Sequence, residues 1–159
     1  MTDLARKALE LARKDIGVTE HPPGSNRGPE VDQYLRDVGL EPANHAYAWC
    51  SAFVSSKIKR AAESLSYLKK FHSSASCHRL VELNPDLLLS TPEDGCVFVH
   101  LDTDRARAHD HAGFVETVFP GGILATTEGN SDKKGSRTGG SVVENCRPHG
   151  YATHWIRIA

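Results

Sequence analysis

Apolar residues in the first half of the chain recur every three or four positions, the spacing of amphipathic helices. Four segments show this pattern: residues 4–16, 31–38, about 49–62 and 74–83. Thr2 or Asp3 can cap the first of these helices, and Gly17 suits a left-handed stop after it. Residues 18–30 are rich in proline, glycine and small polar side chains and predict a loop. The first half is therefore expected to be helical, with one long polar loop.

The second half changes to the period of two that is typical of β-strands. Strand-like segments follow a turn at residues 91–95: residues 96–101, 111–119, 123–128, 141–146 and 154–159. Helices come first and strands afterwards, without alternation, which favours an α+β fold with N-terminal helices packed on a C-terminal antiparallel sheet. No repeat or linker divides the 159 residues, so we expect a single domain spanning 1–159.

Composition excludes several classes of function. Hydrophobic residues make up 39% of the chain and the net charge is −1, which fits a globular protein without the basic face that nucleic-acid binding needs. No apolar run is long enough to span a bilayer, and the charged amino terminus is unlike a secretory signal. We expect a monomer, made in the cytoplasm without a signal peptide, that neither binds nucleic acid nor inserts into a membrane.

The four cysteines are too few for a disulfide scaffold, and none forms a CxxC pair of the kind found in structural zinc sites. Cys77, Cys96 and Cys146 are expected to be core or edge residues without a catalytic role. His109 and His111 alternate on one strand but would need further ligands nearby to hold zinc. We therefore expect no metal and no cofactor.

Cys50 is the candidate nucleophile, because it lies at the expected start of the third helix. A free thiol has a pKa of about 8.5 and is mostly protonated at neutral pH. The positive end of a helix dipole and a nearby imidazolium both lower that pKa. His111 begins a predicted strand, from whose end a side chain can project into a cleft, and it is the candidate base.

A histidine base needs a polar partner that holds its ring. Glu128 and Asn130 lie two residues apart at the end of the next strand, so both are expected to point the same way. Either can accept the second ring N–H of His111 and fix its tautomer. Glu128 is favoured and Asn130 remains the alternative. A cysteine on a helix, a histidine on one strand and an orienting residue on the next form the papain-type arrangement.

Four motifs in order resemble a CHAP domain, the cysteine- and histidine-dependent amidohydrolase/peptidase family. They are WCSAFV at 49–54, DHAGFVE at 110–116, TTEGNSDKKGSRTGGSVVENCR at 126–147, and the lead-in GVTEHPPGSNRGPEVDQYL at 17–35. The lead-in is similar to that of single-domain, phage-lysin-like members. The resemblance covers nearly the whole chain, from about residue 17 to residue 157.

The resemblance implies a papain-like α+β fold and cleavage of an amide bond in peptidoglycan. By motif position, Cys50 would be the nucleophile, His111 the base, Glu128 the orienting acid and Asn130 an additional polar contributor. The backbone N–H of Cys50 would supply one donor of an oxyanion hole. Attack by the thiolate would give a thioester acyl-enzyme that water then releases.

The chain departs from the family pattern in two places and lacks one optional feature. Gly95-Cys96 stands where relatives commonly have Gly-Asp, and Asp110 precedes the histidine where glycine is frequent. Neither change removes a member of the triad. Some relatives carry an aspartate-rich calcium loop before the cysteine, and residues 41–48 lack those acids, so no calcium is expected there.

Substrate contacts are expected from polar and aromatic residues near the nucleophile. Glu20, Ser25 and Asn26 either line a substrate groove or make local turn hydrogen bonds. Tyr47 and Trp49 flank Cys50 and can form the wall of a cleft, although packing is the ordinary role of such a tryptophan.

The expected function is peptidoglycan hydrolysis, as a stem-peptide endopeptidase or an N-acetylmuramoyl-L-alanine amidase. A phage endolysin released by a holin and an antibacterial effector injected into a target cell both fit. Either would act at the cell wall or in the periplasm, and an effector would have an immunity protein as partner. The same triad would also serve a cysteine hydrolase or acyltransferase toxin that acts on proteins, and a catalytically dead binding module is a third class.

Overall fold

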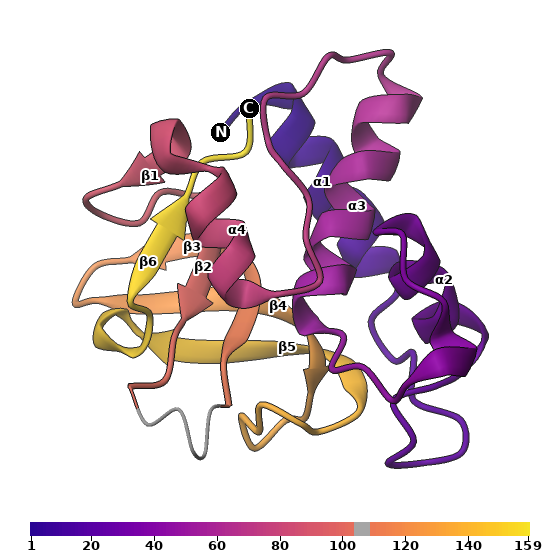
Figure 1. Ribbon diagram of the computed structural model, residues 1–159. Coiled ribbons are helices and arrows are strands. Elements are labelled where there is room, and N and C mark those ends of the chain that lie inside the picture. The colour runs from indigo at the N-terminus through magenta and orange to yellow at the C-terminus, as the bar shows by residue number, and fades with distance from the viewer. Residues whose placement is uncertain (104–108) are drawn as a thin grey trace.

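The structure, a computed structural model, describes residues 1–103 and 109–159, with helices first and strands afterwards (Figure 1). The helices are α1 (Asp3–Lys14), α2 (Pro29–Asp37), α3 (Cys50–Ser64) and α4 (Cys77–Leu83), with 3₁₀ turns η1 (Pro42–Asn44), η2 (Pro85–Leu87) and η3 (His149–Tyr151). The strands are β1 (Leu88–Leu89), β2 (Val97–His100), β3 (His111–Phe119), β4 (Ile123–Ser131), β5 (Ser141–Pro148) and β6 (His154–Ile156). The predicted α+β class is confirmed.

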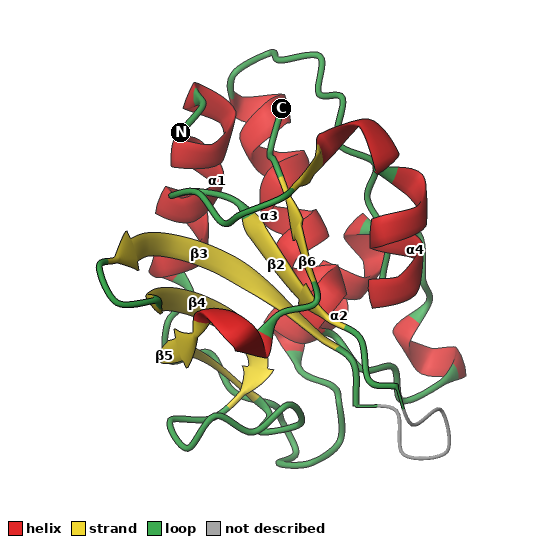
Figure 2. Cartoon of the chain, turned by 90° about the vertical axis from the view of Figure 1, so that its left-hand side faces the viewer, coloured by secondary structure: helices red, strands yellow, loops and turns green. Residues whose placement is uncertain are grey.

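The strands form one antiparallel sheet in the order β1-β6-β2-β3-β4-β5. The last strand, β6, returns to lie between β1 and β2, while β3, β4 and β5 follow one another as a meander. Figure 2 shows α1 and α3 together behind the sheet, with α4 to one side of them. The N-terminal helices therefore pack on a C-terminal sheet, as the order of patterns predicted.

Helix α3 is the central element of the core. Every residue from Cys50 to Ile58 is buried, because α1 and α2 cover the side of α3 that faces away from the sheet. A second, smaller hydrophobic cluster includes Phe98, Leu124 and Trp155 from three different strands. The main cluster contains residues of α3, β2 and β3, so burial of its apolar area fixes the position of the sheet relative to α3.

Gly129 allows β4 to approach α3 closely. A Cβ atom at this position would lie 2.8 Å from atoms of both Phe53 and Trp49, closer than side chains can pack. Because only glycine fits, the backbone next to Glu128 comes within reach of the N-terminus of α3. This contact positions the end of β4 beside Cys50.

A buried polar cluster joins α1, α2 and α3 on the far side of the core. The Lys57 ammonium forms an ion pair with Asp15, and the Tyr34 hydroxyl donates to the same carboxylate. Lys57 also lies 4.8 Å from the centre of the Tyr34 ring. Burial lowers the pKa of Lys57, while the Asp15 carboxylate opposes that shift. The cluster is internally satisfied, so it holds the three helices in register.

The two ends of the chain lie side by side (Figure 1). Thr2 caps α1 by accepting from the backbone N–H of Ala5 at 3.0 Å, and its hydroxyl donates to the carbonyl of Ile158 at 2.7 Å. The predicted cap is therefore confirmed. Within residues 1–103 and 109–159, no helix combines the length and the apolar character that crossing a membrane would require.

Candidate active site

Cys50 is the first residue of α3, and Trp49 precedes it as the N-cap. The sulfur therefore lies at the positive end of the helix dipole, as predicted. Trp49 is fully buried, and its indole N–H donates to the Glu20 carboxylate at 2.9 Å. This hydrogen bond between two buried side chains holds the start of α3 in place. Glu20 was predicted either to line a groove or to make local hydrogen bonds, and Trp49 either to form a wall or to pack; both side chains are buried in the structure.

His111 begins β3 and is completely buried. Its Nε2 lies 2.9 Å from Oε2 of Glu128, on the adjacent strand β4. Its Nδ1 has no hydrogen-bond partner of normal geometry in the described part of the chain. The Cys50 thiol lies close enough to perturb the protonation of the ring. Since Nε2 is engaged by Glu128, Nδ1 is the nitrogen that can take up the thiol proton.

Glu128 is completely buried and accepts hydrogen bonds on both carboxylate oxygens. The Arg147 guanidinium, from β5, donates two hydrogen bonds to the carboxylate, at 2.8 and 2.5 Å. Further donors complete the shell: Thr126 at 2.7 Å, Ser131 at 3.1 Å and Asn145 at 3.3 Å. Paired, charge-assisted bonds of this kind fix the carboxylate in one orientation. Glu128 can therefore hold the imidazole ring without moving itself.

These contacts set the charges of the site. Burial would raise the pKa of Glu128, but hydrogen bonds from Arg147 and His111 hold it far below its usual range. Burial would likewise lower the pKa of His111, but the nearby Cys50 sulfur and the hydrogen bond with Glu128 raise that pKa to about 9. At neutral pH the carboxylate is therefore ionised and the imidazole is protonated.

A second cysteine stands directly beside the nucleophile. Cys77 is the first residue of α4, and its sulfur lies 4.0 Å from that of Cys50. The hydrogen bond with Cys77 is the largest cause that lowers the pKa of Cys50 well below its usual value, with His111 adding to it. Cys77 was predicted to be a core or edge residue without a catalytic role. It is buried, and its sulfur contacts that of Cys50.

Asn130 is not equivalent to Glu128. It adopts a left-handed backbone with φ of 54°, and the pairing of β4 with β5 shifts register between Glu128 and Ser131. This irregularity breaks the strict alternation on which the prediction of a shared direction depended. The Asn130 amide is buried, and neither of its polar atoms has a partner among the described residues. Glu128 alone of the two contacts His111 through a hydrogen bond.

Ser25 and Asn26 have local roles in the loop before α2. The Ser25 hydroxyl donates to the Pro22 carbonyl at 2.5 Å and accepts from the Arg27 N–H at 3.2 Å. Asn26 adopts a left-handed conformation with φ of 55°. These contacts correspond to the turn hydrogen bonds that were the alternative prediction for this loop.

Tyr47 lies on an accessible surface close to Cys50. It lines a hollow of about 500 Å³ whose other lining residues come from two segments, residues 38–48 and 73–76. Ala48 lies two residues before Cys50 and Ser76 directly precedes Cys77, but neither cysteine nor His111 lines the hollow.

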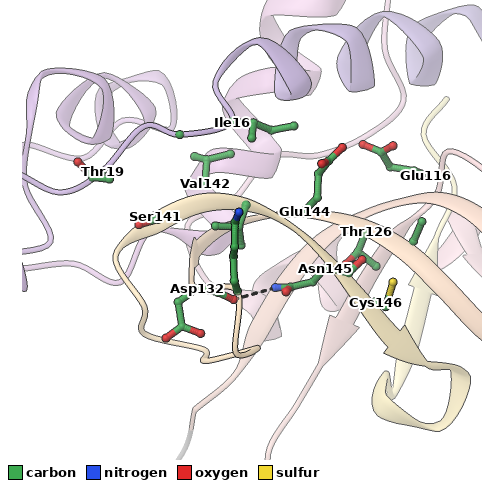
Figure 3. A pocket seen from close by; sticks show the side chains of 14 residues that line it. Ile16, Thr19, Glu116, Thr126, Asp132, Ser141, Val142, Glu144, Asn145 and Cys146 are labelled. Atoms are coloured by element: carbon green, nitrogen blue, oxygen red, sulfur yellow. Dashed lines mark hydrogen bonds between the residues drawn. The ribbon is translucent and has the colours of Figure 1, made fainter.

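A larger pocket of about 800 Å³ lies elsewhere, between the segment after α1 and the strands β4 and β5 (Figure 3). Thr126 and Asn145 belong to its lining and also donate to Glu128. Figure 3 shows the Asn145 side chain bonded to the Asp132 carbonyl, a contact of 3.1 Å. The pocket therefore reaches the back of the Glu128 carboxylate, and neither Cys50 nor His111 lines it.

Asp110, the residue before His111, links two elements around the site. Its carboxylate accepts from the Asp102 N–H at 2.9 Å and lies 3.2 Å from Nε2 of His78. His78 follows Cys77 on α4, and Asp110 precedes His111. The carboxylate therefore ties α4 to the start of β3, a connection that a glycine could not make.

Among the residues described, no group of three or more His, Cys, Asp or Glu side chains is arranged to hold a metal ion. Comparison with known proteins finds no match, whether to a family model, to a curated protein or to a solved structure.

Proposed function

We propose that this protein is a cysteine-dependent amidohydrolase/peptidase that cleaves an amide bond in peptidoglycan. The observation that carries the proposal is the 2.9 Å contact between Nε2 of His111 and Glu128, which leaves Nδ1 for the Cys50 thiol. A carboxylate, an imidazole and a sulfur in this order form the set that nucleophilic catalysis at a carbonyl requires.

The reaction follows from the charges of these groups. The Cys50 thiolate attacks the amide carbonyl, and the backbone N–H of Cys50, at the start of α3, faces the oxygen on which negative charge develops. His111 then donates its proton to the leaving amine, and a thioester acyl-enzyme remains. Water, deprotonated by His111, attacks the thioester and restores the thiolate. Glu128 keeps the ring oriented through both halves of the cycle.

Peptidoglycan as the substrate is supported by the four motifs that resemble a CHAP domain. The stem peptide offers the amide bonds that this site would cut, and the chain segments on either side of the two buried cysteines line a hollow of about 500 Å³. Endopeptidase and N-acetylmuramoyl-L-alanine amidase activities use the same triad. In both cases the enzyme would act at the cell wall, as a phage lysin or as an effector countered by an immunity protein.

Digestion of purified sacculi tests the proposal. The wild-type protein should release muropeptides, and mass spectrometry of the new termini identifies the amide that is cut. Cys50→Ala should release none while keeping its far-UV circular dichroism spectrum. Cys146→Ala is the matched control, because this thiol is exposed on β5 whereas that of Cys50 is buried, and the change should leave the rate unchanged.

Two outcomes would overturn the proposal. Muropeptide release by Cys50→Ala at the wild-type rate would mean that another group is the nucleophile. No release by the folded wild-type protein, together with cleavage or deamidation of a protein substrate, would assign the same site to a toxin that acts on proteins.

A further inference from the structure

Cys77 is a buried sulfur that the hydrolytic mechanism does not use. All four cysteines of the chain are free, and the sulfurs of Cys50 and Cys77 lie 4.0 Å apart. Each is the first residue of a helix, Cys50 of α3 and Cys77 of α4. Their exposed fractions are 4% and 5%, so both residues are almost completely buried side by side.

The two sulfurs differ in protonation. The hydrogen bond with Cys77 and the nearby imidazole of His111 lower the pKa of Cys50. The hydrogen bond with Cys50, followed by burial, raises the pKa of Cys77. Cys50 is therefore the thiolate of the pair and Cys77 the thiol. A thiolate next to a second thiol is the arrangement in which an oxidised sulfur is captured as a disulfide.

The segment before α4 is fastened to α3, which keeps the two sulfurs together. The hydroxyls of Ser51 and Ser55 both donate to the Ser74 carbonyl, at 2.8 and 2.9 Å. The Ser74 N–H in turn donates to Ser55 at 3.0 Å. A disulfide requires the sulfurs to approach from 4.0 Å to about 2 Å, and these contacts keep α4 next to the start of α3 for that approach.

We infer that Cys50 and Cys77 form a reversible disulfide when the protein meets a hydroperoxide. The Cys50 thiolate attacks one peroxide oxygen, so that the O–O bond breaks, Cys50 becomes a sulfenic acid and hydroxide leaves. The Cys77 sulfur then attacks the sulfenic sulfur, the S–O bond breaks and water leaves with the Cys77 proton. Two thiols lose two electrons in total, and one peroxide is reduced to water. A dithiol reductant reverses the cross-link.

The cross-link has two consequences. It removes the nucleophile from reaction until a reductant restores it, and it prevents further oxidation of Cys50 to the irreversible sulfinic acid. The cross-link itself depends only on the two sulfurs, whereas its effect on hydrolysis rests on the proposed function. The two are therefore tested by separate measurements.

Intact mass and peptide mapping test the cross-link without any assay of hydrolysis. The reduced protein is treated with a small excess of hydrogen peroxide at pH 7, quenched with N-ethylmaleimide in denaturant and digested with trypsin without reduction. The wild type should lose about 2 Da and two of its four titratable thiols. Peptides 37–57 and 71–79, each with one cysteine, should appear joined, and dithiothreitol should separate them.

Two variants sharpen the test. Cys146→Ala should form the same cross-link as the wild type, because the cross-link joins the buried sulfurs of Cys50 and Cys77 and Cys146 is exposed. Cys77→Ala should instead accumulate oxygen adducts on Cys50 that dithiothreitol does not fully remove. Sulfinic acid on Cys50 of the wild type with no 37–57/71–79 cross-link would overturn the inference, and so would a disulfide that involves Cys96 or Cys146. The wild-type map decides the question even where a variant folds poorly.

Discussion

Replacing Arg147 by methionine should destabilise the protein strongly, because it strips a buried carboxylate of its main counter-charge. Arg147 is 7% exposed and Glu128 is not exposed at all. The guanidinium makes two bonds to Glu128, donates to the Gly135 carbonyl at 2.9 Å and lies 4.4 Å from the centre of the Tyr151 ring. Methionine fills part of the space but replaces none of these polar contacts.

The magnitude follows from the burial of the pair. Removing one partner of a buried ion pair costs about 3–5 kcal/mol, because the other charge remains without compensation. Protonated His111 still faces Glu128 at 2.9 Å, so we expect the lower end of this range, about 3 kcal/mol. For a domain of this size, each kcal/mol lowers Tm by roughly 2–4 °C, which gives a fall of about 6–12 °C.

Urea and thermal unfolding at pH 7 measure this loss. Arg157→Met is the matched control, because Arg157 makes a similar two-bond pair with Glu93 on the surface, where both side chains are more than a third exposed. That variant should lose less than about 1 kcal/mol. Removing both charges, in the double variant Arg147→Met with Glu128→Gln, should cost less than the sum of the two single changes.

The pH dependence of the Arg147→Met penalty has a definite sign. The pKa of Glu128 is lowered in the folded protein, so its contribution to stability is present above the unfolded value near 4.5 and is lost as the pH falls below it. The penalty should therefore be largest at neutral pH and shrink toward pH 3. A penalty within about 0.5 kcal/mol of zero at pH 7, or strict additivity in the double variant, would refute the account of Glu128 as a charge held by Arg147.

The remaining predictions concern the imidazole, the polar cluster under α3 and the contact of α3 with β4. Because the pKa of His111 is raised to about 9, its proton is lost as the pH rises through that value, so the rate of sacculus digestion should fall there; a flat alkaline profile contradicts the assignment. Lys57→Met leaves Asp15 without its cation and should cost about 1–3 kcal/mol in urea unfolding, whereas an unchanged midpoint would mean that the pair contributes nothing. Gly129→Ala should cost about 1–3 kcal/mol and slow hydrolysis, because its Cβ would push Phe53 away; wild-type stability would show that α3 yields freely.

Local signals predicted the α+β order of the fold and named Cys50, His111 and Glu128 as the candidate site. Caps and apolar spacing act within a few residues, so the start of α1 at Thr2 and of α3 at Cys50 could be predicted from neighbours alone. His111 and Glu128 lie near the ends of adjacent strands joined by a short turn, so their proximity follows from a simple meander. The hydrogen bond between them is consistent with the predicted preference for Glu128 over Asn130.

Arg147 and Cys77 were missed because their positions depend on long-range pairing. The predicted last strand of the meander ended at Cys146, one residue before Arg147, and an arginine there would ordinarily face solvent. Only the register of β5, which places Arg147 opposite Leu124, brings its guanidinium to Glu128. The position of Cys77 depends on how residues 65–76 return along α3, which the serine hydroxyls of that helix determine. No pattern within a few residues of Arg147 or Cys77 indicates that either side chain lies near the candidate site.

Because of Gly129, side chains can be replaced on one side of Cys50 but not on the other. On that side the wall is backbone pressed against Trp49 and Phe53, so no substitution there can widen the approach to the sulfur. Residues 73–76, all with small side chains, instead line the hollow beside Tyr47, directly before α4. Libraries that test the proposed peptide specificity should therefore vary these residues and leave the β4 side as it is.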